Sequence, residues 1–362
     1  MVDYIIVGGG SAGCVLANRL TEQSNTQVLL LEAGQPDKQR EIHIPAAYSQ
    51  AFKTDLDWAY QTAPQACLDE RSLYWPRGKV LGGSSSINAM IYIRGHRMDY
   101  NKWRELGATG WGWNDVLPYF KKAEHQARGV SADYGIDGPL HVADQISPNE
   151  LTLTFIRAAQ KMGIEANPDF NGEKQDGVGL YQVTQKQGTR HSTAAAYIKP
   201  VLHRPNLSVE TNAHVTRILF EDRRAVGVEY VQDGKTKTVN CTAEIILCGG
   251  SINSPQLLML SGIGDSAHLK SHHIDVIADL KGVGQNLQDH IACGVVHEST
   301  QPVSLAGAQS ITNILRYFIT KKGALTSNVG EGGLFWRSDP DLPKPDVQFH
   351  FAPIHYLDHG LT

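Results

Sequence analysis

The first thirty-four residues contain two apolar runs separated by one helical pattern. Residues 3–7 (DYIIV) are apolar apart from Asp3, and residues 27–34 (QVLLLEAG) form the second run. Between them, from Ala12 to about Thr21, apolar residues recur at the spacing of one helix face. This order predicts strand, turn, helix and strand, which is the unit of a parallel sheet in an α/β fold.

The rest of the chain carries longer and more mixed patterns. In chain order they predict an irregular surface excursion over 35–75, helices over 113–126 and 147–163, strands with hairpins over 206–247, and a helix over 254–264. Asn114 and Ser147 are the expected N-caps of the first two helices, and Pro255 is expected at the first position of the third.

Two motifs overlap in the glycine-rich turn after the first strand. Gly8, Gly10 and Gly13 fit G-x-G-x-x-G, a dinucleotide-binding turn in which a helix N-terminus faces the phosphates. Read instead from Gly9, the same turn fits G-x-S-x-G, in which Ser11 would be a hydrolase nucleophile. That motif needs a preceding oxyanion loop, and only seven residues precede Gly8. The dinucleotide interpretation is therefore favoured, with Ser11 as a phosphate donor.

An acidic residue completes the dinucleotide pattern. Glu32 stands nineteen residues after Gly13, at the end of the second predicted strand. A carboxylate at that place accepts hydrogen bonds from ribose hydroxyls.

Composition narrows the class of protein. The chain has 362 residues, of which 41% are hydrophobic and 19% charged, and its net charge is −4. This charge gives no sign of a nucleic-acid partner. The five cysteines are scattered, so we expect reduced thiols in a cytoplasmic protein. We find no targeting segment and no membrane span, and expect at most peripheral association with the inner face of the cell membrane.

Two long segments resemble one enzyme family. Residues 78–101 (GKVLGGSSSINAMIYIRGHRMDYN) and 250–264 (GSINSPQLLMLSGIG) fit the two signatures of the glucose–methanol–choline (GMC) oxidoreductases. Residues 283–290 (VGQNLQDH) resemble a third recurrent segment. The resemblance covers the whole chain and is closest to the choline and alkanol dehydrogenase branch.

The resemblance implies a fold and its division. We expect an α/β fold, with an FAD-binding Rossmann-like domain, a substrate domain on an antiparallel sheet, and the C-terminal part of the family fold absent. The expected segments are 1–100 and 196–292 for the FAD-binding domain, 101–195 as a substrate-domain insert, and 293–362 as an incomplete substrate domain.

The resemblance also implies site residues for FAD. Val80 and Gly82 would help to hold flavin and phosphate, and Val215 would contact adenine. The flavin ring edge would lie along Asn88, Ala89, Met90 and Ile91. In some members a histidine of this loop bonds covalently to flavin, but the best-aligned residue here is Ile87, so non-covalent FAD is expected.

Histidines elsewhere carry weaker patterns. The resemblance places Asp289 and His290 near the flavin, and we interpret them as a capping and hydrogen-bonding pair. His268 and His272 have a metal-compatible spacing without a third ligand, so no metal is expected.

The implied activity is FAD-dependent oxidation of a primary alcohol, aliphatic or choline-like, to the aldehyde by hydride transfer to flavin N5. The partners would be a small-molecule alcohol and an electron acceptor such as a respiratory quinone. The family's base is a histidine of an H-P-x-G-T motif, which does not occur in residues 1–362. The catalytic histidine pair is therefore expected beyond Thr362. The alternative function is a catalytically incomplete N-terminal flavoprotein fragment.

Overall fold

The computed structural model describes residues 2–356 and 358–360. The chain forms two compact units, each assembled from three segments. Unit 1 consists of Met1–Lys38, Ala51–Ile87 and Ser192–Cys293, and unit 2 of Gln39–Gln50, Asn88–His191 and Gly294–Thr362.

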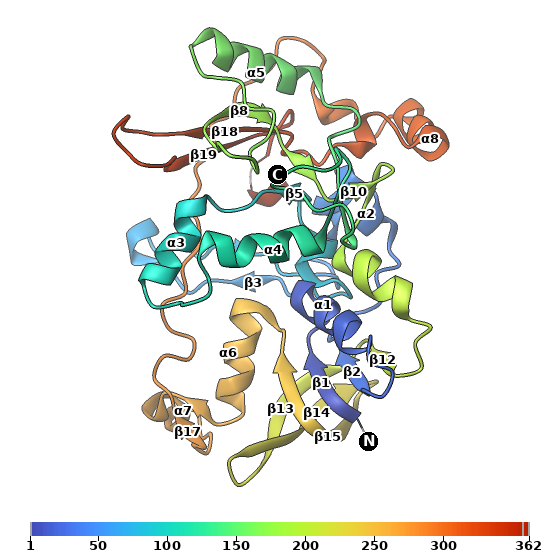
Figure 1. Cartoon of the computed structure of the whole chain (residues 1–362), viewed down its shortest axis with the longest axis vertical. Coiled ribbons are helices and arrows are strands. Elements are labelled where there is room, and N and C mark those ends of the chain that lie inside the picture. The colour runs from blue at the N-terminus through green and yellow to red at the C-terminus, as the bar shows by residue number, and fades with distance from the viewer. Residues whose placement is uncertain (1, 357, 361–362) are drawn as a thin grey trace. The chain divides into compact units, whose positions relative to one another are not determined.

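Unit 1 is built on a six-stranded mixed sheet in the order β12-β2-β1-β15-β14-β13 (Figure 1). β12, β2, β1 and the end of β15 run parallel, whereas β13, β14 and β15 form an antiparallel meander. The strands are β1 (Val2–Val7), β2 (Val28–Leu31), β12 (Leu207–Glu210), β13 (His214–Glu221), β14 (Arg224–Gln232) and β15 (Lys235–Leu247). The strand–helix–strand start expected from the sequence is present, with α1 (Ser11–Leu20) between β1 and β2.

β15 joins the two halves of this sheet. Its first part, Lys235–Asn240, pairs antiparallel with β14. Its second part, Cys241–Leu247, pairs parallel with β1. One strand of 13 residues therefore belongs to both the parallel and the antiparallel half.

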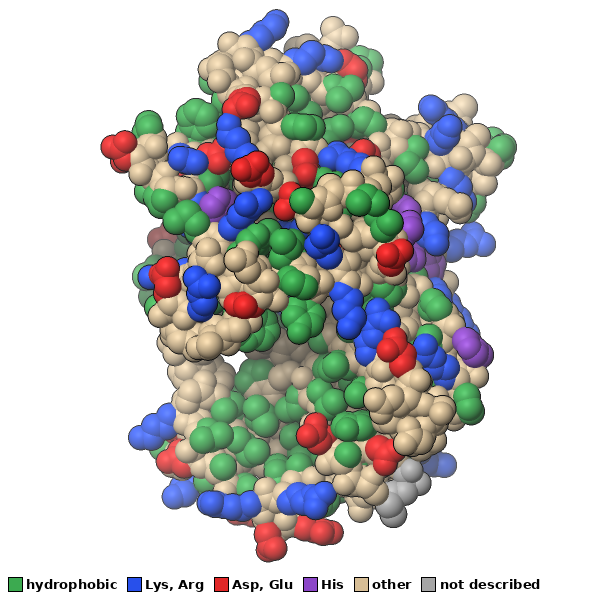
Figure 2. Space-filling model, viewed as in Figure 1, with side chains coloured by type: hydrophobic (Ala, Val, Ile, Leu, Met, Phe, Trp, Pro, Cys, Tyr) green, Lys and Arg blue, Asp and Glu red, His purple; other side chains and the backbone are tan. Residues whose placement is uncertain are grey.

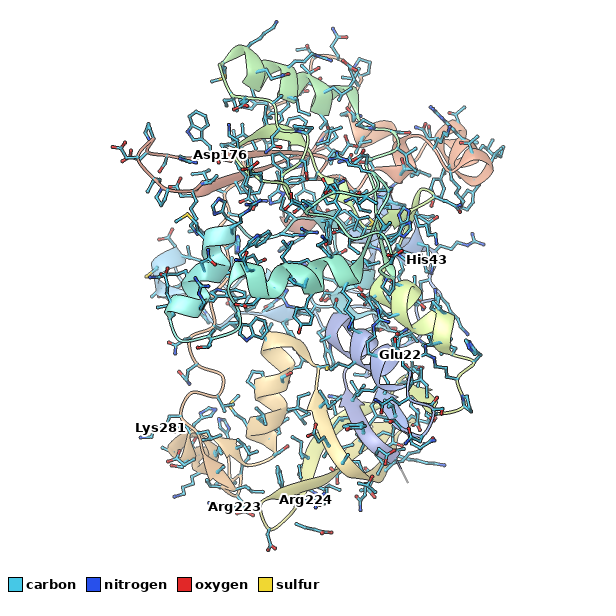
Figure 3. All side chains as sticks on the ribbon, in the orientation of Figure 1. Glu22, His43, Asp176, Arg223, Arg224 and Lys281 are labelled. Atoms are coloured by element: carbon cyan, nitrogen blue, oxygen red, sulfur yellow. The ribbon has the colours of Figure 1, made fainter. Side chains whose placement is uncertain are left out.

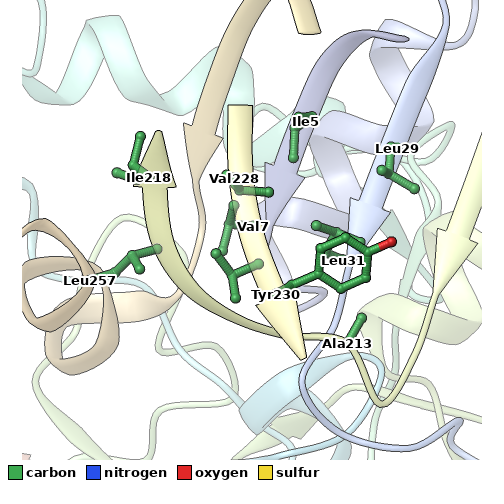
Figure 4. Packing of buried hydrophobic residues seen from close by; sticks show 10 residues of the cluster. Ile5, Val7, Leu29, Leu31, Ala213, Ile218, Val228, Tyr230 and Leu257 are labelled. Carbon is green, nitrogen blue, oxygen red and sulfur yellow. The ribbon is translucent and has the colours of Figure 1, made fainter. Parts of the chain in front are cut away.

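One hydrophobic cluster of unit 1 lies on one face of the sheet (Figure 4). Leu257 of α6 (Gly250–Leu260) points toward the strands that carry Val7 and Ile218. All four residues of β2 are buried, which is the pattern of a strand covered on both faces. The cluster comprises Ile5, Val7, Leu29, Leu31, Ala213, Val215, Ile218, Val228, Tyr230 and Leu257.

Short elements complete unit 1. They are β3 (Tyr60–Gln61), β4 (Tyr74–Trp75), β16 (Ile263–Gly264), α7 (Ser266–Ser271), β17 (Ala278–Asp279) and the helical turns Ala66–Leu68, Gly83–Ser86, Ala194–Ile198 and Lys199–Val201.

Unit 2 contains the antiparallel sheet expected of a substrate domain, in the order β19-β18-β8. α5 (Glu150–Lys161) contributes Ala159 to a core shared with Val178 of β8 and Leu334 of β18. Asp176, labelled in Figure 3, precedes β8 and pairs at 2.7 Å with Arg337, which follows β18.

The remaining elements of unit 2 are mostly short. The unit's strands are β5 (Ile91–Tyr92), β6 (Glu124–Gln126), β7 (Leu140–Val142), β8 (Gly177–Leu180), β9 (Gln182–Val183), β10 (Gln185–Lys186), β11 (Thr189–Arg190), β18 (Gly332–Trp336) and β19 (Val347–Phe351). Its helices are α2 (Arg40–His43), α3 (Arg97–Glu105), α4 (Trp113–Ala123), α5 and α8 (Ile311–Thr320), with helical turns at Pro45–Ala51, Leu305–Gly307, Ala324–Thr326 and Asp358–Gly360.

The expected segments differ from the units at several boundaries. Residues 39–50 and 88–100, expected in the FAD-binding part, belong to unit 2, and residues 192–195 and 293, expected outside it, belong to unit 1. For residues 39–50, one physical reason is a buried hydrogen bond of 2.7 Å from Arg190 Nε to the Ile42 carbonyl.

The expected helices exist, but their N-caps differ from those expected. α4 is capped by Gly112, whose N–H donates to Asp115, so Asn114 lies inside the first turn. α5 is capped by the Asn149 side chain, which accepts from Leu151 N at 2.8 Å. The Ser147 hydroxyl instead accepts from Gly323 N at 3.0 Å.

Two other boundaries also differ from those expected. α4 ends at Ala123, and Glu124–Gln126 form β6. α6 begins at Gly250, which places Pro255 inside the helix.

Candidate nucleotide-binding site

A cavity of about 570 Å³ lies in unit 1 at the carboxyl ends of β1, β2 and β15. Ligands of open α/β sheets bind at this edge, and ligand pockets measure about 300–1,000 Å³. The lining residues come from six stretches of the chain. They are Val7–Ala12 without Gly9, Leu31–Ala33, Trp58, the residues Arg77, Gly78, Gly83 and Ser84, Ala213–Val215, and Leu247–Leu260 without Pro255, Leu258 and Met259.

Two glycines allow the turn after β1 to pack against its neighbours. Gly8 has φ +104°, and a Cβ there would lie 2.6 Å from the Cys248 carbonyl oxygen. A Cβ on Gly13 would lie 1.9 Å from the Gly8 carbonyl oxygen. A side chain at either place would push α1 away from the strand ends, so this turn requires glycine.

The N-termini of two helices border the cavity. α1 begins at Ser11, and its N-cap Gly10 offers no side-chain bond. α6 begins at Gly250 after the N-cap Gly249, again without a side-chain bond. Free N–H groups and the positive end of the helix dipole suit an anionic ligand such as a phosphate.

Glu32 forms the acidic part of the cavity wall. The residue is 5% exposed. Its carboxylate oxygens accept from Gly9 N at 2.7 Å and from Gly34 N at 2.8 Å. Burial raises the pKa of Glu32 to about 7, although these two donors and Lys79 oppose the shift. Each carboxylate oxygen retains a lone pair for a further donor, which is what a ribose hydroxyl needs.

The 78–86 loop packs directly on the glycine turn. Gly82 N donates to the Gly9 carbonyl at 2.7 Å, and a Cβ on Gly83 would lie 2.7 Å from Gly10 Cα. Val80 is fully buried and forms a parallel bridge with Gln35. Val80, Gly82 and Gly13 therefore shape the cavity without lining it.

Val215, expected at the adenine, lines the cavity beside His214. His214 contacts the edge of Trp58, with ring centroids 5.4 Å apart. Burial and the nearby charge of Lys79 lower the pKa of His214.

The sequence patterns did not predict several residues that line the cavity. Trp58 fell in the segment interpreted as a surface excursion, and Arg77 carried no pattern of its own. The start of α6 also lines the cavity. It lies within the second family signature, residues 250–264, and this signature was the signal that could have identified these site residues.

Asn88, Ala89, Met90 and Ile91 belong to unit 2. Met90 is buried with φ +57°, and its N–H donates to Asn88 Oδ1 at 3.0 Å. Arg190 Nη1 donates to the same oxygen at 2.8 Å. Their expected contact with the flavin remains a prediction.

The weaker histidine patterns form local contacts. Asp289 accepts from Trp75 Nε1 and from His290 N, each at 2.8 Å. The rings of His268 and His272 lie 4.8 Å apart. Among residues 2–356 and 358–360, no three potential metal ligands come together.

Comparison with known proteins decides the family. A family model described as GMC oxidoreductase matches residues 2–292. The chain belongs to the GMC oxidoreductase family. Membership supports the dinucleotide interpretation of the glycine turn over the hydrolase one.

Individual GMC relatives are similar over nearly the whole chain. An alcohol dehydrogenase [acceptor] of Pseudomonas putida is 50% identical over 99% of this chain and 67% of its own length. The mitochondrial choline dehydrogenase of Mus musculus is 48% identical over 99% of this chain and 62% of its own length. The chain thus spans 62% to 67% of the length of these two curated relatives.

A solved structure shows the same fold. A variant of the Aspergillus oryzae formate oxidase, in which FAD modification was studied, is 27% identical with a TM-score of 0.86, covering 98% of this chain and 68% of its own. These comparisons confirm the GMC family, the α/β fold and, at the level of the family, the FAD cofactor expected from the sequence.

Proposed function

We propose that unit 1 binds FAD non-covalently and that the protein serves the oxidation of a primary alcohol, aliphatic or choline-like, to the aldehyde. The cavity at the carboxyl ends of β1, β2 and β15 carries the proposal. The names of the alcohol and choline dehydrogenase relatives support the substrate class.

The residues of the cavity fit the adenosine and pyrophosphate part of FAD. The N–H groups of Ser11 and Ala12, with the Ser11 hydroxyl, would bind pyrophosphate at the start of α1. Glu32 would accept the ribose hydroxyls, and Val215 would contact adenine. Gly8 and Gly13 allow the turn to pack closely on backbone, and Gly10, whose Cβ would have no atom nearer than 3.9 Å, leaves space for the phosphates beside α1.

FAD, when bound, supplies hydride acceptance at flavin N5. The chain's own task is to hold the nucleotide and to orient the alcohol, while a base removes the hydroxyl proton. Because residues 1–362 contain no H-P-x-G-T motif, the second candidate is a flavoprotein part that binds FAD without turnover. A respiratory quinone is the electron acceptor that we propose.

Non-covalent attachment rests on Ile87. This residue stands where some family members carry a flavin-linking histidine, and it is 2% exposed. A hydrocarbon side chain cannot form such a bond.

Acid precipitation of the purified, FAD-loaded protein tests the proposal. We expect all flavin in the supernatant, with the absorbance spectrum of free FAD. Flavin retained on the precipitate would contradict non-covalent binding, and protein that binds NAD but no flavin would contradict the cofactor. An Ile87→His variant is the matched control for covalent attachment.

A further inference from the structure

α8 exposes a continuous apolar stripe. Ile311, Ile314, Leu315, Phe318 and Ile319 are between 37% and 78% exposed. Their spacing of three and four residues places them on one face of the helix. A different side of the helix packs into unit 2 through Tyr317, which is 1% exposed and donates to the Gly188 carbonyl at 3.2 Å. The stripe is therefore not the packing face of α8.

The charged residues of the chain segment that carries this stripe have one sign. No Asp or Glu occurs from Ser299 to Gly330, while Arg316, Lys321 and Lys322 lie in or just after α8. Lys321 ends the helix with φ +54°, and its ammonium lies 4.4 Å from the Tyr317 ring centroid. In Figure 2, hydrophobic and Lys/Arg side chains lie together where Figure 1 shows α8. The cationic segment contrasts with the chain's net charge of −4.

We propose that α8 docks on the surface of an anionic lipid bilayer. A helix of 10 residues is about 15 Å long, half of the ~30 Å needed to cross the hydrocarbon. No helix in the described part of the chain has the length and apolarity of a membrane span. An exposed aliphatic stripe flanked by lysine and arginine is the pattern of a helix that lies in the membrane interface.

The composition of the stripe favours lipid over a protein partner. The cores of protein interfaces are enriched in aromatic residues, Met and Arg and depleted of Lys. The α8 stripe has four aliphatic residues and one Phe, with two lysines at its end. Lysines in this place would face anionic headgroups.

Vesicle flotation of the full chain 1–362 tests the proposal. The probes are vesicles of phosphatidylcholine with and without phosphatidylglycerol. We expect the protein to float with the anionic vesicles and the bound fraction to fall at high salt. Leu315→Glu with Ile319→Glu should reduce the partition coefficient at least tenfold. Met162→Glu, at an equally exposed apolar residue that follows α5, should leave it unchanged.

Lys322→Gln tests the electrostatic contribution to binding. It should lower the partition coefficient into anionic vesicles about fivefold, because it removes one cation near the membrane surface. Circular dichroism of each variant controls for folding, and Ile319→Ser replaces the double variant if that one unfolds. No binding to anionic vesicles, or binding insensitive to residues 315 and 319, would overturn the proposal. Concentration-dependent self-association that the double variant abolishes, without vesicle binding, would assign the stripe to a second copy instead. None of these readouts depends on FAD.

Discussion

Gly10 and Gly13 stand three residues apart in one turn, yet they differ in the space available for a methyl group. A Cβ on Gly13 would lie 1.9 Å from a backbone oxygen. The nearest atoms to a Cβ on Gly10 lie at 3.9 Å. Gly13 is therefore required for packing, whereas Gly10 leaves room beside the N-terminus of α1.

We therefore predict unequal losses of stability in the apoprotein. Gly13→Ala should lower the free energy of unfolding by about 3 kcal/mol, because backbone must move to accept the methyl group. Gly10→Ala should cost at most about 1 kcal/mol, the difference between these residues at a helix N-cap. Urea denaturation followed by fluorescence measures both. Equal losses at the two positions would contradict the packing described for Gly13.

Glu32 is a buried carboxyl group whose proton affinity depends on folding. Its pKa rises from an ordinary value of 4.5 to about 7 in the folded protein. The folded state then binds the proton more tightly than the unfolded state. The stability contributed by Glu32 is fully present below pH 4.5 and is lost as the pH rises to about 7.

This linkage predicts the behaviour of Glu32→Gln. Between pH 4.5 and 7 the wild-type apoprotein should lose about 3 kcal/mol of unfolding free energy relative to the variant. The variant should also bind FAD more weakly at pH 8, since Gln carries one acceptor instead of two. Denaturation at several pH values gives the difference, with exposed Glu173→Gln as the control. A Glu32→Gln curve parallel to the wild-type curve would show that Glu32 does not titrate in this range.

At the scale of elements, the sequence predicted that helices exist better than it predicted their N-caps. Periodicity identified α4 and α5 because it depends on neighbouring residues alone. The N-caps depend on partners far along the chain: Ser147 is engaged by Gly323 N, so Asn149 caps α5. A single sequence does not reveal which of two capping residues has such a competing partner.

Alanine substitutions at Asn149 and Asn114 test which of these residues is an N-cap. Asn149→Ala should cost about 1 kcal/mol of unfolding free energy, because the first turn of α5 loses its cap. Asn114→Ala should be neutral or slightly stabilising, because this exposed residue lies inside α4, where Ala has the higher helix propensity. Urea denaturation of both variants decides the point. The reverse order of effects would contradict these N-cap assignments.

For the whole molecule, the local parts of the site were predictable and the assembled parts were not. The glycine turn and Glu32 follow from a short pattern and Val215 from the family resemblance, and all contribute to one cavity. Trp58 and Arg77 join the same cavity from a segment without periodicity, so only the folded chain places them. The alternation of the two units, with residues 39–50 in unit 2, likewise depends on contacts between distant segments.

The proposed function makes a prediction for the polypeptide 1–362 as a whole. Reconstituted with FAD, it should reduce an acceptor dye with aliphatic alcohols or choline about 10²–10⁴-fold more slowly than the Pseudomonas putida relative. This is the factor that general-base assistance typically contributes. Bound flavin, measured by absorbance, controls for reconstitution. Turnover equal to that of the relative would place the base within this chain, and His290 would be the first residue to replace.

The dual pairing of β15 bears on how the chain reaches its native state during synthesis. β1 pairs with β2, which is synthesised soon after it, but the other edge of β1 pairs with Cys241–Leu247, which is synthesised much later. At about 5–20 residues per second, the ribosome needs on the order of 10–50 s to deliver that partner. Throughout this interval the nascent chain presents an unsatisfied apolar strand edge, a template for intermolecular pairing. Nascent-chain protection by chaperones should therefore matter more for the yield of this protein than its final stability does.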